Sequence, residues 1–112
     1  MSSGFLETGL SDEAKNIHRA LASLQEELEA IDYYHQRAEV ADDEALTAVL
    51  AHNRDDEMEH AVMLLEWLRR TMPEIDVQMR KFLFTSGSLP DLAKGLEPTA
   101  AKGAGLGLGN LK

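Results

Sequence analysis

Residues 46–67 read LTAVLAHNRDDEMEHAVMLLEW, and the spacing within this stretch decides the fold. One set of positions recurs at alternating steps of four and three residues, which is the period of one face of an α-helix. The set is Leu46, Leu50, Asn53, Glu57, His60, Leu64 and Trp67. The stretch therefore predicts a long amphipathic helix. Asp42 or Asp43 can cap its start, and Pro73 predicts an end near Thr71, because proline disfavours helical geometry in the preceding residue.

A second helical pattern with the same period precedes this stretch. Its apolar face is Ile17, Leu21, Leu24, Leu28 and Ile31, and a neighbouring face is Ala20, Leu24, Glu27, Ile31 and Tyr34. Ser11 can cap this helix, acidic residues follow in its first turn, and we expect it to end near Ala38. Residues 74–84 predict a short third helix, with an apolar face of Ile75, Met79, Phe82 and Leu83. The chain is therefore predicted to be all-α.

The two long helices are expected to form an antiparallel hairpin, because only about four residues connect helices of ~40 Å. A lone hairpin leaves most of its apolar face in water, and so few ordered residues rarely form a stable core. We therefore expect two copies to pair as a homodimer into a four-helix bundle. In such a bundle Trp67 is expected to lie in the core.

Glycine divides the chain into three parts, because none of the eight glycines lies between residues 11 and 86. We interpret residues 1–10 as a flexible leader and residues 11–85 as the helical domain. Residues 86–112 are rich in small side chains, which is typical of a flexible tail.

Composition excludes several classes of function. The chain has 11 basic and 20 acidic side chains and a formal charge of −9, which argues against nucleic-acid binding and suits a protein that handles cations. It has no cysteine, so thiolate metal sites and cysteine nucleophiles are excluded. No apolar run reaches the ~20 residues that cross a bilayer, and the first residues lack the features of a secretory signal. We expect a cytoplasmic protein without a membrane partner.

Three polar residues occupy positions where the helical period favours leucine: Glu27, Glu57 and His60. Burying an unpaired carboxylate costs several kcal/mol, so something must compensate these charges. Glu57 and His60 are three residues apart and share one helix face. A ferritin-like di-iron site takes a glutamate from each of two helices and a Glu-x-x-His pair from each of two others. This chain supplies one helix of each kind, so a twofold partner would complete the site.

Other interpretations of these residues stay open at this point. The three side chains could form a buried ion-pair network that only fixes the pairing of a non-catalytic helical adaptor. The Glu-x-x-His spacing is weak evidence by itself, and Asp32 with His35 forms a rival pair at the end of the first helix. A peroxide-reducing di-iron protein of the rubrerythrin type is a further alternative, although the chain lacks the cysteines of a rubredoxin site.

Two runs of sequence resemble the encapsulated ferritins, which are half-length ferritin-like proteins packed inside encapsulin nanocompartments. The runs are QEELEAIDYY (25–34) and LAHNRDDEMEHA (50–61), the second continuing to LEWLRR (65–70). The resemblance spans about residues 12–84, together with the end of the tail. One departure is Tyr33, which stands where the family is expected to have tryptophan.

The resemblance implies a function and an assembly that composition and spacing do not give. It implies ferroxidase activity, the oxidation of Fe(II) by O₂, with Glu27, Glu57 and His60 as ligands of two iron ions at each homodimer interface. It also implies a ring of five dimers. It favours Glu26 and Glu29 as an accessory site that attracts iron before the centre, over the alternative of a solvated acidic face. We expect Tyr34 to donate a hydrogen bond to the ligand shell rather than only to pack.

The tail ends in GLGLGNLK (105–112), which places three leucines among glycines. An ordinary disordered terminus is the simplest interpretation, but such termini are usually polar. The segment is similar to the cargo-loading peptides that bind the inner wall of encapsulin shells. The resemblance thus implies an encapsulin shell protein as the partner of this tail, and a location inside an encapsulin nanocompartment.

Overall fold

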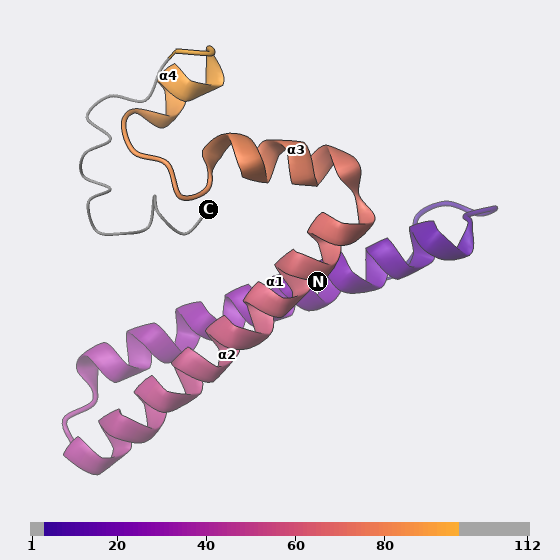
Figure 1. Cartoon of the computed structure of the whole chain (residues 1–112). Coiled ribbons are helices and arrows are strands. Elements are labelled where there is room, and N and C mark those ends of the chain that lie inside the picture. Colours follow the sequence, from indigo (N-terminus) through magenta and orange to yellow (C-terminus); the bar gives the residue numbers. More distant parts are fainter. Residues whose placement is uncertain (1–3, 97–112) are drawn as a thin grey trace. The chain divides into compact units, whose positions relative to one another are not determined.

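The computed structural model describes residues 4–96 and confirms that this part of the chain is helical. Its four helices are α1 (Asp12–Val40), α2 (Glu44–Thr71), α3 (Pro73–Phe82) and α4 (Leu89–Ala93) (Figure 1). The chain divides into two units, residues 1–71 and residues 72–112. The first unit is the predicted antiparallel hairpin of α1 and α2, and the second contains the two short helices.

Helix α1 begins at the predicted cap. The Ser11 hydroxyl accepts a hydrogen bond from the backbone N–H of Ala14 at 3.0 Å, and Asp12 and Glu13 occupy the first turn. Acidic side chains there complement the positive end of the helix dipole. The helix continues two residues beyond the predicted end at Ala38, because no residue in that segment interrupts it.

The connection between the long helices ends in a capped start of α2. Asp43 accepts a hydrogen bond from the backbone N–H of Leu46 at 2.8 Å, so Asp43 is the capping residue of the two candidates. The Thr47 hydroxyl also donates to the backbone carbonyl of Ala41 at 3.2 Å, which closes the turn. The predicted end at Thr71 is confirmed, and Pro73 lies two residues further along the chain.

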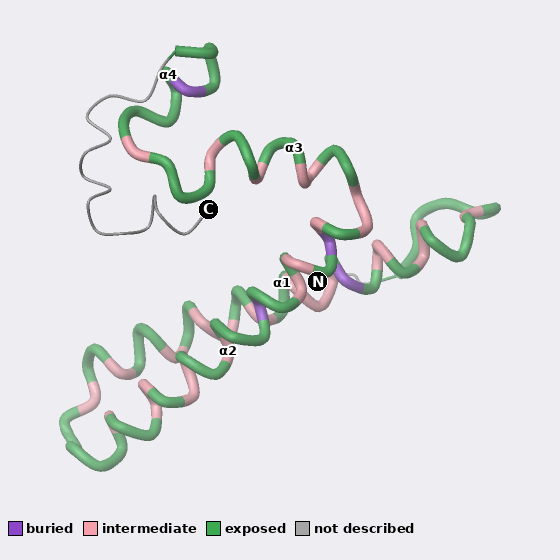
Figure 2. The backbone as a smooth tube through the Cα atoms, in the orientation of Figure 1, coloured by how far each residue is buried: buried purple, intermediate pink, exposed green. Residues whose placement is uncertain are grey.

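The hairpin buries few side chains. Ala20 of α1 and Ala61 and Leu68 of α2 are its fully buried apolar residues, and most of the tube in Figure 2 is exposed or intermediate. Trp67 is 39% exposed in the single chain, so its position in the core of a bundle stays a prediction. Large side chains from the predicted apolar faces are also exposed in the single chain, among them Leu21, Leu28 and Leu46.

The second unit departs from prediction in three places. Helix α3 begins at Pro73 itself, because proline fits the first turn of a helix, where its missing N–H is not needed. It ends at Phe82, before the predicted end at residue 84, since Phe84 has a φ of 60° and cannot continue a right-handed helix. Within the segment expected to be a flexible tail, Ser88 caps the short helix α4, which buries Leu92. The predicted peptide at 105–112 lies outside the described residues.

The described part of the leader makes specific contacts with α1. The Phe5 ring lies 4.8 Å from the His18 ring, and the Arg19 guanidinium lies 5.7 Å from the centre of the Phe5 ring. Between residues 4 and 96, no helix is both long and apolar enough to span a bilayer.

Candidate metal centre

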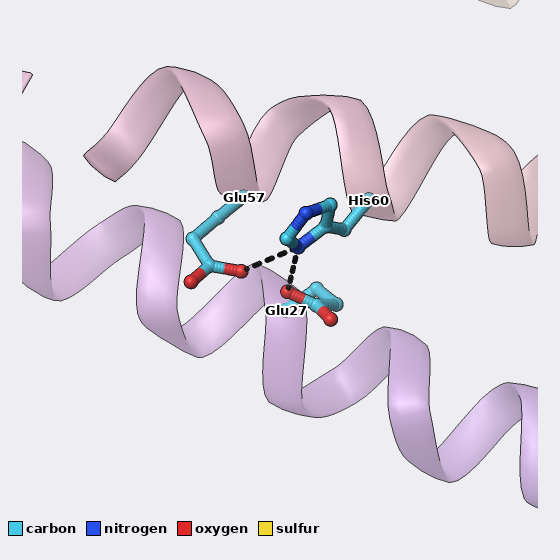
Figure 3. A group of neighbouring side chains, drawn as sticks. All are labelled: Glu27, Glu57 and His60. Carbon is cyan, nitrogen blue, oxygen red and sulfur yellow. Dashed lines mark hydrogen bonds and ion pairs between the residues drawn. The ribbon is translucent and has the colours of Figure 1, made fainter. Parts of the chain in front are cut away.

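The hairpin brings the three predicted ligands together. Glu27 comes from α1, and Glu57 and His60 come from adjacent turns of α2 (Figure 3). One donor atom from each residue lies within 4.8 Å of the others. In residues 4–96, these three side chains are the group of acidic and histidine residues found close enough together to hold a metal ion. His60 Nδ1 lies 3.2 Å from Glu57 Oε1 and 3.6 Å from Glu27 Oε1. The Nδ1 atom of the imidazole therefore faces both carboxylates.

The three side chains are partly open to solvent in the single chain. The Glu27 and Glu57 side chains are 25% and 24% exposed, whereas the His60 side chain is 48% exposed. The cluster therefore lies at the edge of the α1–α2 contact, with about half of the His60 side chain open to solvent.

Mutual proximity shifts the protonation of all three groups. The hydrogen bond with Glu57 raises the pKa of Glu27, and the same bond lowers the pKa of Glu57. Desolvation lowers the pKa of His60, but the hydrogen bond with Glu57 and the charges of both carboxylates outweigh it and raise that pKa above its usual value. Without a cation, Glu27 and His60 therefore hold their protons more tightly than isolated side chains do. A metal ion that binds here must displace protons.

The donor set fits a divalent first-row metal. Carboxylate oxygens are hard ligands that suit Fe, Mn and Mg, and an imidazole nitrogen suits Fe, Zn and Cu. Two carboxylates with one imidazole therefore fit iron. Three protein donors also leave coordination positions open, as catalytic metal sites require.

The predicted accessory residues lie outside this group of three. Glu26 and Glu29 are exposed on α1, and the Tyr33 hydroxyl donates a hydrogen bond to Glu29 Oε2 at 3.1 Å. That bond and the negative charge of Glu29 raise the pKa of Tyr33. Tyr34 is half-buried, and the contact found for its ring is with the Arg37 guanidinium at 5.6 Å. The predicted hydrogen bond from Tyr34 to the ligand shell is not among those found in residues 4–96.

The rival pair is occupied by other contacts. The Asp32 carboxylate accepts a hydrogen bond from the Gln36 amide at 2.9 Å. His35 Nδ1 lies 3.2 Å from the Arg54 guanidinium of α2. Because a guanidinium is a permanent cation, its position beside this nitrogen opposes metal binding at His35.

A family model described as EncFtn-like matches residues 6–86 of the chain. The chain belongs to the EncFtn-like family. This EncFtn-like chain is 46% identical over 115 aligned residues to the encapsulated ferritin-like protein of Rhodospirillum rubrum, covering 92% of this chain and 82% of that protein. It is 49% identical over 83 residues to the ferritin-like protein of Thermotoga maritima, covering 74% and 73% of the two chains.

A solved structure is also similar to the EncFtn-like chain. The crystal structure of protein ne0167 from Nitrosomonas europaea has 51% sequence identity and a TM-score of 0.73. The similarity covers 77% of this chain and 97% of that one. The α1–α2 hairpin is therefore a ferritin-like helical arrangement, as the resemblance implied.

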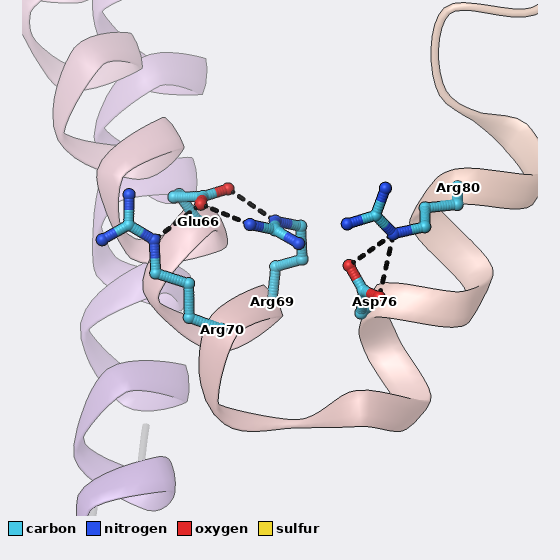
Figure 4. A network of polar contacts seen from close by, with 5 residues as sticks. All are labelled: Glu66, Arg69, Arg70, Asp76 and Arg80. Atoms are coloured by element: carbon cyan, nitrogen blue, oxygen red, sulfur yellow. Dashed lines mark hydrogen bonds and ion pairs between the residues drawn. The ribbon is translucent and has the colours of Figure 1, made fainter.

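A second polar cluster near the end of α2 was not predicted. Glu66 accepts hydrogen bonds from Arg69 at 2.8 Å and from Arg70 at 2.7 Å, and these bonds lower the pKa of Glu66 to about 2 (Figure 4). In the second unit, Arg80 pairs in the same way with Asp76 at 3.0 Å. The spacings of three and four residues within one helix could have predicted both sets of contacts.

The Glu66 cluster predicts a pH-dependent contribution to stability. The folded pKa of about 2 lies below the ordinary value of 4.5, so ionised Glu66 stabilises the fold above pH 4.5. This contribution is lost as the pH falls through that interval. We expect Glu66→Gln to lower the melting temperature at neutral pH, and the difference from wild type to shrink as the pH falls from about 5 towards about 3.

Glu59→Gln is the matched control, because Glu59 is an exposed glutamate of the same helix. Thermal unfolding followed by circular dichroism measures both variants against wild type. A Glu66→Gln difference that stays constant across this pH range would contradict the assignment.

Proposed function

We propose that this protein is a ferroxidase that oxidises Fe(II) to Fe(III) with O₂ at a di-iron site shared between two copies of the chain. The observation that carries the proposal is the convergence of Glu27, Glu57 and His60 from both long helices within 4.8 Å. Membership of the EncFtn-like family supports an iron-related function, because its relatives are named ferritin-like.

Exposure around the cluster supports a site completed by a second copy. Apolar side chains flank His60 on α2 and are exposed in the single chain: Leu46 at 48%, Val49 at 54%, Met63 at 58% and Trp67 at 39%. A twofold partner on this face would cover them and bring a second set of three donors against the first. We expect this homodimer to be the ferritin-like four-helix bundle, with Trp67 in its core.

Charge balance supports two iron ions for each pair of chains. Glu27, Glu57 and their twofold mates carry four negative charges when ionised, which two Fe(II) ions would neutralise. Iron supplies the redox chemistry when bound. The chain supplies hard oxygen donors that suit both oxidation states, and His60 supplies a nitrogen donor once it has lost its proton.

The destination of the product follows from the proposed location. A bundle of two helices per chain has no space for a mineral core, so Fe(III) must leave the site. The R. rubrum relative is named an encapsulated ferritin-like protein. We therefore propose that this chain works inside an encapsulin shell, held there by residues 105–112, and that its dimers form a ring of five.

Loss of one ligand should remove most of the activity. We expect Glu57→Ala or His60→Ala to slow aerobic Fe(II) oxidation by roughly tenfold or more, because each change removes two ligands from a twofold site. Absorbance of the Fe(III) product measures the rate, and far-ultraviolet circular dichroism checks helical content.

Matched controls are Glu59→Ala and His52→Ala, which remove the same side chains from exposed positions of the same helix. These should oxidise iron at the wild-type rate. Wild-type kinetics in the ligand variants would place the site elsewhere. If the wild-type protein oxidised Fe(II) only at the background rate, the result would favour the alternative of a non-catalytic helical adaptor.

The accessory acidic residues should affect the delivery of iron rather than the chemistry. We expect Glu26→Gln with Glu29→Gln to raise the Fe(II) concentration for half-maximal rate, while the maximal rate stays close to wild type. The effect should be largest at low ionic strength, where charges attract over longer distances. Unchanged kinetics at low salt would return both residues to an ordinary solvated face.

The tail should serve loading and not catalysis. Deleting residues 105–112 should abolish co-purification with a co-expressed encapsulin shell, because an extended segment can place alternate leucines in pockets of a groove. Fe(II) oxidation and oligomer size should be unchanged. Retained loading would exclude the docking role, and lost activity would assign the tail to the catalytic assembly.

A further inference from the structure

Asn53 is a polar residue on the ligand-bearing face of α2 that the metal centre leaves without a role. Like Glu57 and His60, it occupies a position where the helical period favours leucine. It is half-buried, and among the described residues 4–96 its side-chain amide has no hydrogen-bond partner. An amide that is covered without a partner costs free energy that leucine would not cost. A hydrogen bond made during function would offset that cost.

Helical geometry places Asn53 in line with both ligands of α2. At 100° per residue, it points about 40° away from Glu57 and about 20° away from His60 around the helix axis. It precedes Glu57 by four residues, a spacing that makes two side chains neighbours. Side chains of an α-helix tilt toward its N-terminus, so the Glu57 side chain leans over the turn that holds Asn53. Glu57 therefore has the amide on its N-terminal side and the imidazole on its C-terminal side.

The Glu57 carboxylate has capacity for a further hydrogen bond. Its Oε1 atom lies 3.2 Å from His60 Nδ1, and Figure 3 shows its other oxygen directed away from the imidazole. A carboxylate has about four sites at which it accepts hydrogen bonds. A donor on the side away from His60 can therefore bond to Glu57 without competing with the imidazole.

The other side-chain donor in the turn before Glu57 is already engaged. Arg54 Nε donates to Asp55 Oδ1 at 3.1 Å, and Arg54 Nη1 lies 3.2 Å from His35 Nδ1. These contacts direct the guanidinium to Asp55 and across the hairpin to α1. The Asn53 amide is therefore the uncommitted side-chain donor in this turn.

Binding of iron would leave Glu57 in need of such a donor. The Nδ1 atom of His60 faces both carboxylates, and it must lose its proton before it can ligate a metal ion. Once it has done so, it no longer donates to Glu57. Carboxylates that ligate metals are themselves held by hydrogen bonds from neighbouring groups.

We propose that Asn53 is a positioning residue of the metal centre, whose amide N–H donates a hydrogen bond to the Glu57 carboxylate when iron binds. This bond takes the place of the contact with His60 and holds the carboxylate in its ligating orientation. The inference rests on the proposed ferroxidase function and deepens it, because it adds a residue that acts through a ligand. The rival role for an asparagine on an apolar helix face is to fix the register of pairing with another helix.

The variant Asn53→Leu tests the proposal, because it removes the donor and continues the apolar period of α2. Anaerobic titration calorimetry with Fe(II) measures the affinity. We expect Asn53→Leu to bind Fe(II) about tenfold more weakly than wild type, which is typical when a group that holds a metal ligand is lost. Its melting temperature in chelator should equal or exceed that of wild type, since no hydrogen bond within the chain is lost. Unchanged affinity, or a lower melting temperature in chelator, would overturn the proposal.

Two further variants separate the hydrogen bond from side-chain volume. Asn53→Gln keeps the amide, so it should bind Fe(II) severalfold more tightly than Asn53→Leu. Asn16→Leu makes the same change at an exposed position of α1, eleven residues before Glu27, and should bind as wild type does. Co(II) used in place of Fe(II) reports the ligand geometry through its visible absorption, which Asn53→Leu should alter and Asn53→Gln should retain. A glutamine variant as weak as the leucine variant would overturn the donor role.

The same measurements distinguish this inference from the proposed function. Wild-type protein that binds Fe(II) but oxidises it only at the background rate would contradict the ferroxidase function, and the comparison of affinities would still test Asn53. No Fe(II) binding by wild-type protein would overturn both. If Asn53→Leu changed the oligomers seen in sedimentation while its Fe(II) affinity stayed at the wild-type value, Asn53 would fix helix pairing and the positioning role would be wrong.

Discussion

A two-helix hairpin cannot cover its own apolar side chains, and the other features of this chain depend on that constraint. Helices α1 and α2 meet along one narrow seam, where Ala61 and Leu68 are buried. On either side of the seam α2 leaves apolar side chains in water. Burial of these side chains would supply the main driving force for the proposed association, because the free energy gained scales with the apolar area removed from water.

The candidate metal centre combines a position at the edge of the hairpin contact with the acidic character of the chain. Glu27, Glu57 and His60 lie at the margin of the seam, partly exposed, with one donor atom of each within 4.8 Å of the others. A fully buried site would cost too much in desolvation without its metal, and a fully exposed one would not hold its donors in place. The observed cluster is half open, and in the proposed dimer a second copy would complete it.

Polar contacts elsewhere in the hairpin are local and fix the geometry that the centre needs. Ser11 and Asp43 cap the starts of α1 and α2. Glu66 holds two arginines in the last turn of α2. These contacts stabilise helices whose packing is limited, since they satisfy backbone groups and helix-end charges without a large core.

The sequence by itself determined the two long helices, most of α3 and the identity of the candidate ligands. Steps of three and four residues follow the period of the α-helix, so Glu57 and His60 had to share a face wherever α2 packed. Only the tertiary structure decided that Glu27 meets them, because that contact depends on how α1 and α2 align. It also decided the exposure of Trp67, the bond from Tyr33 to Glu29 and the helix α4. The physical reason is that local spacing fixes directions around one helix, whereas distances between helices depend on how two surfaces pack.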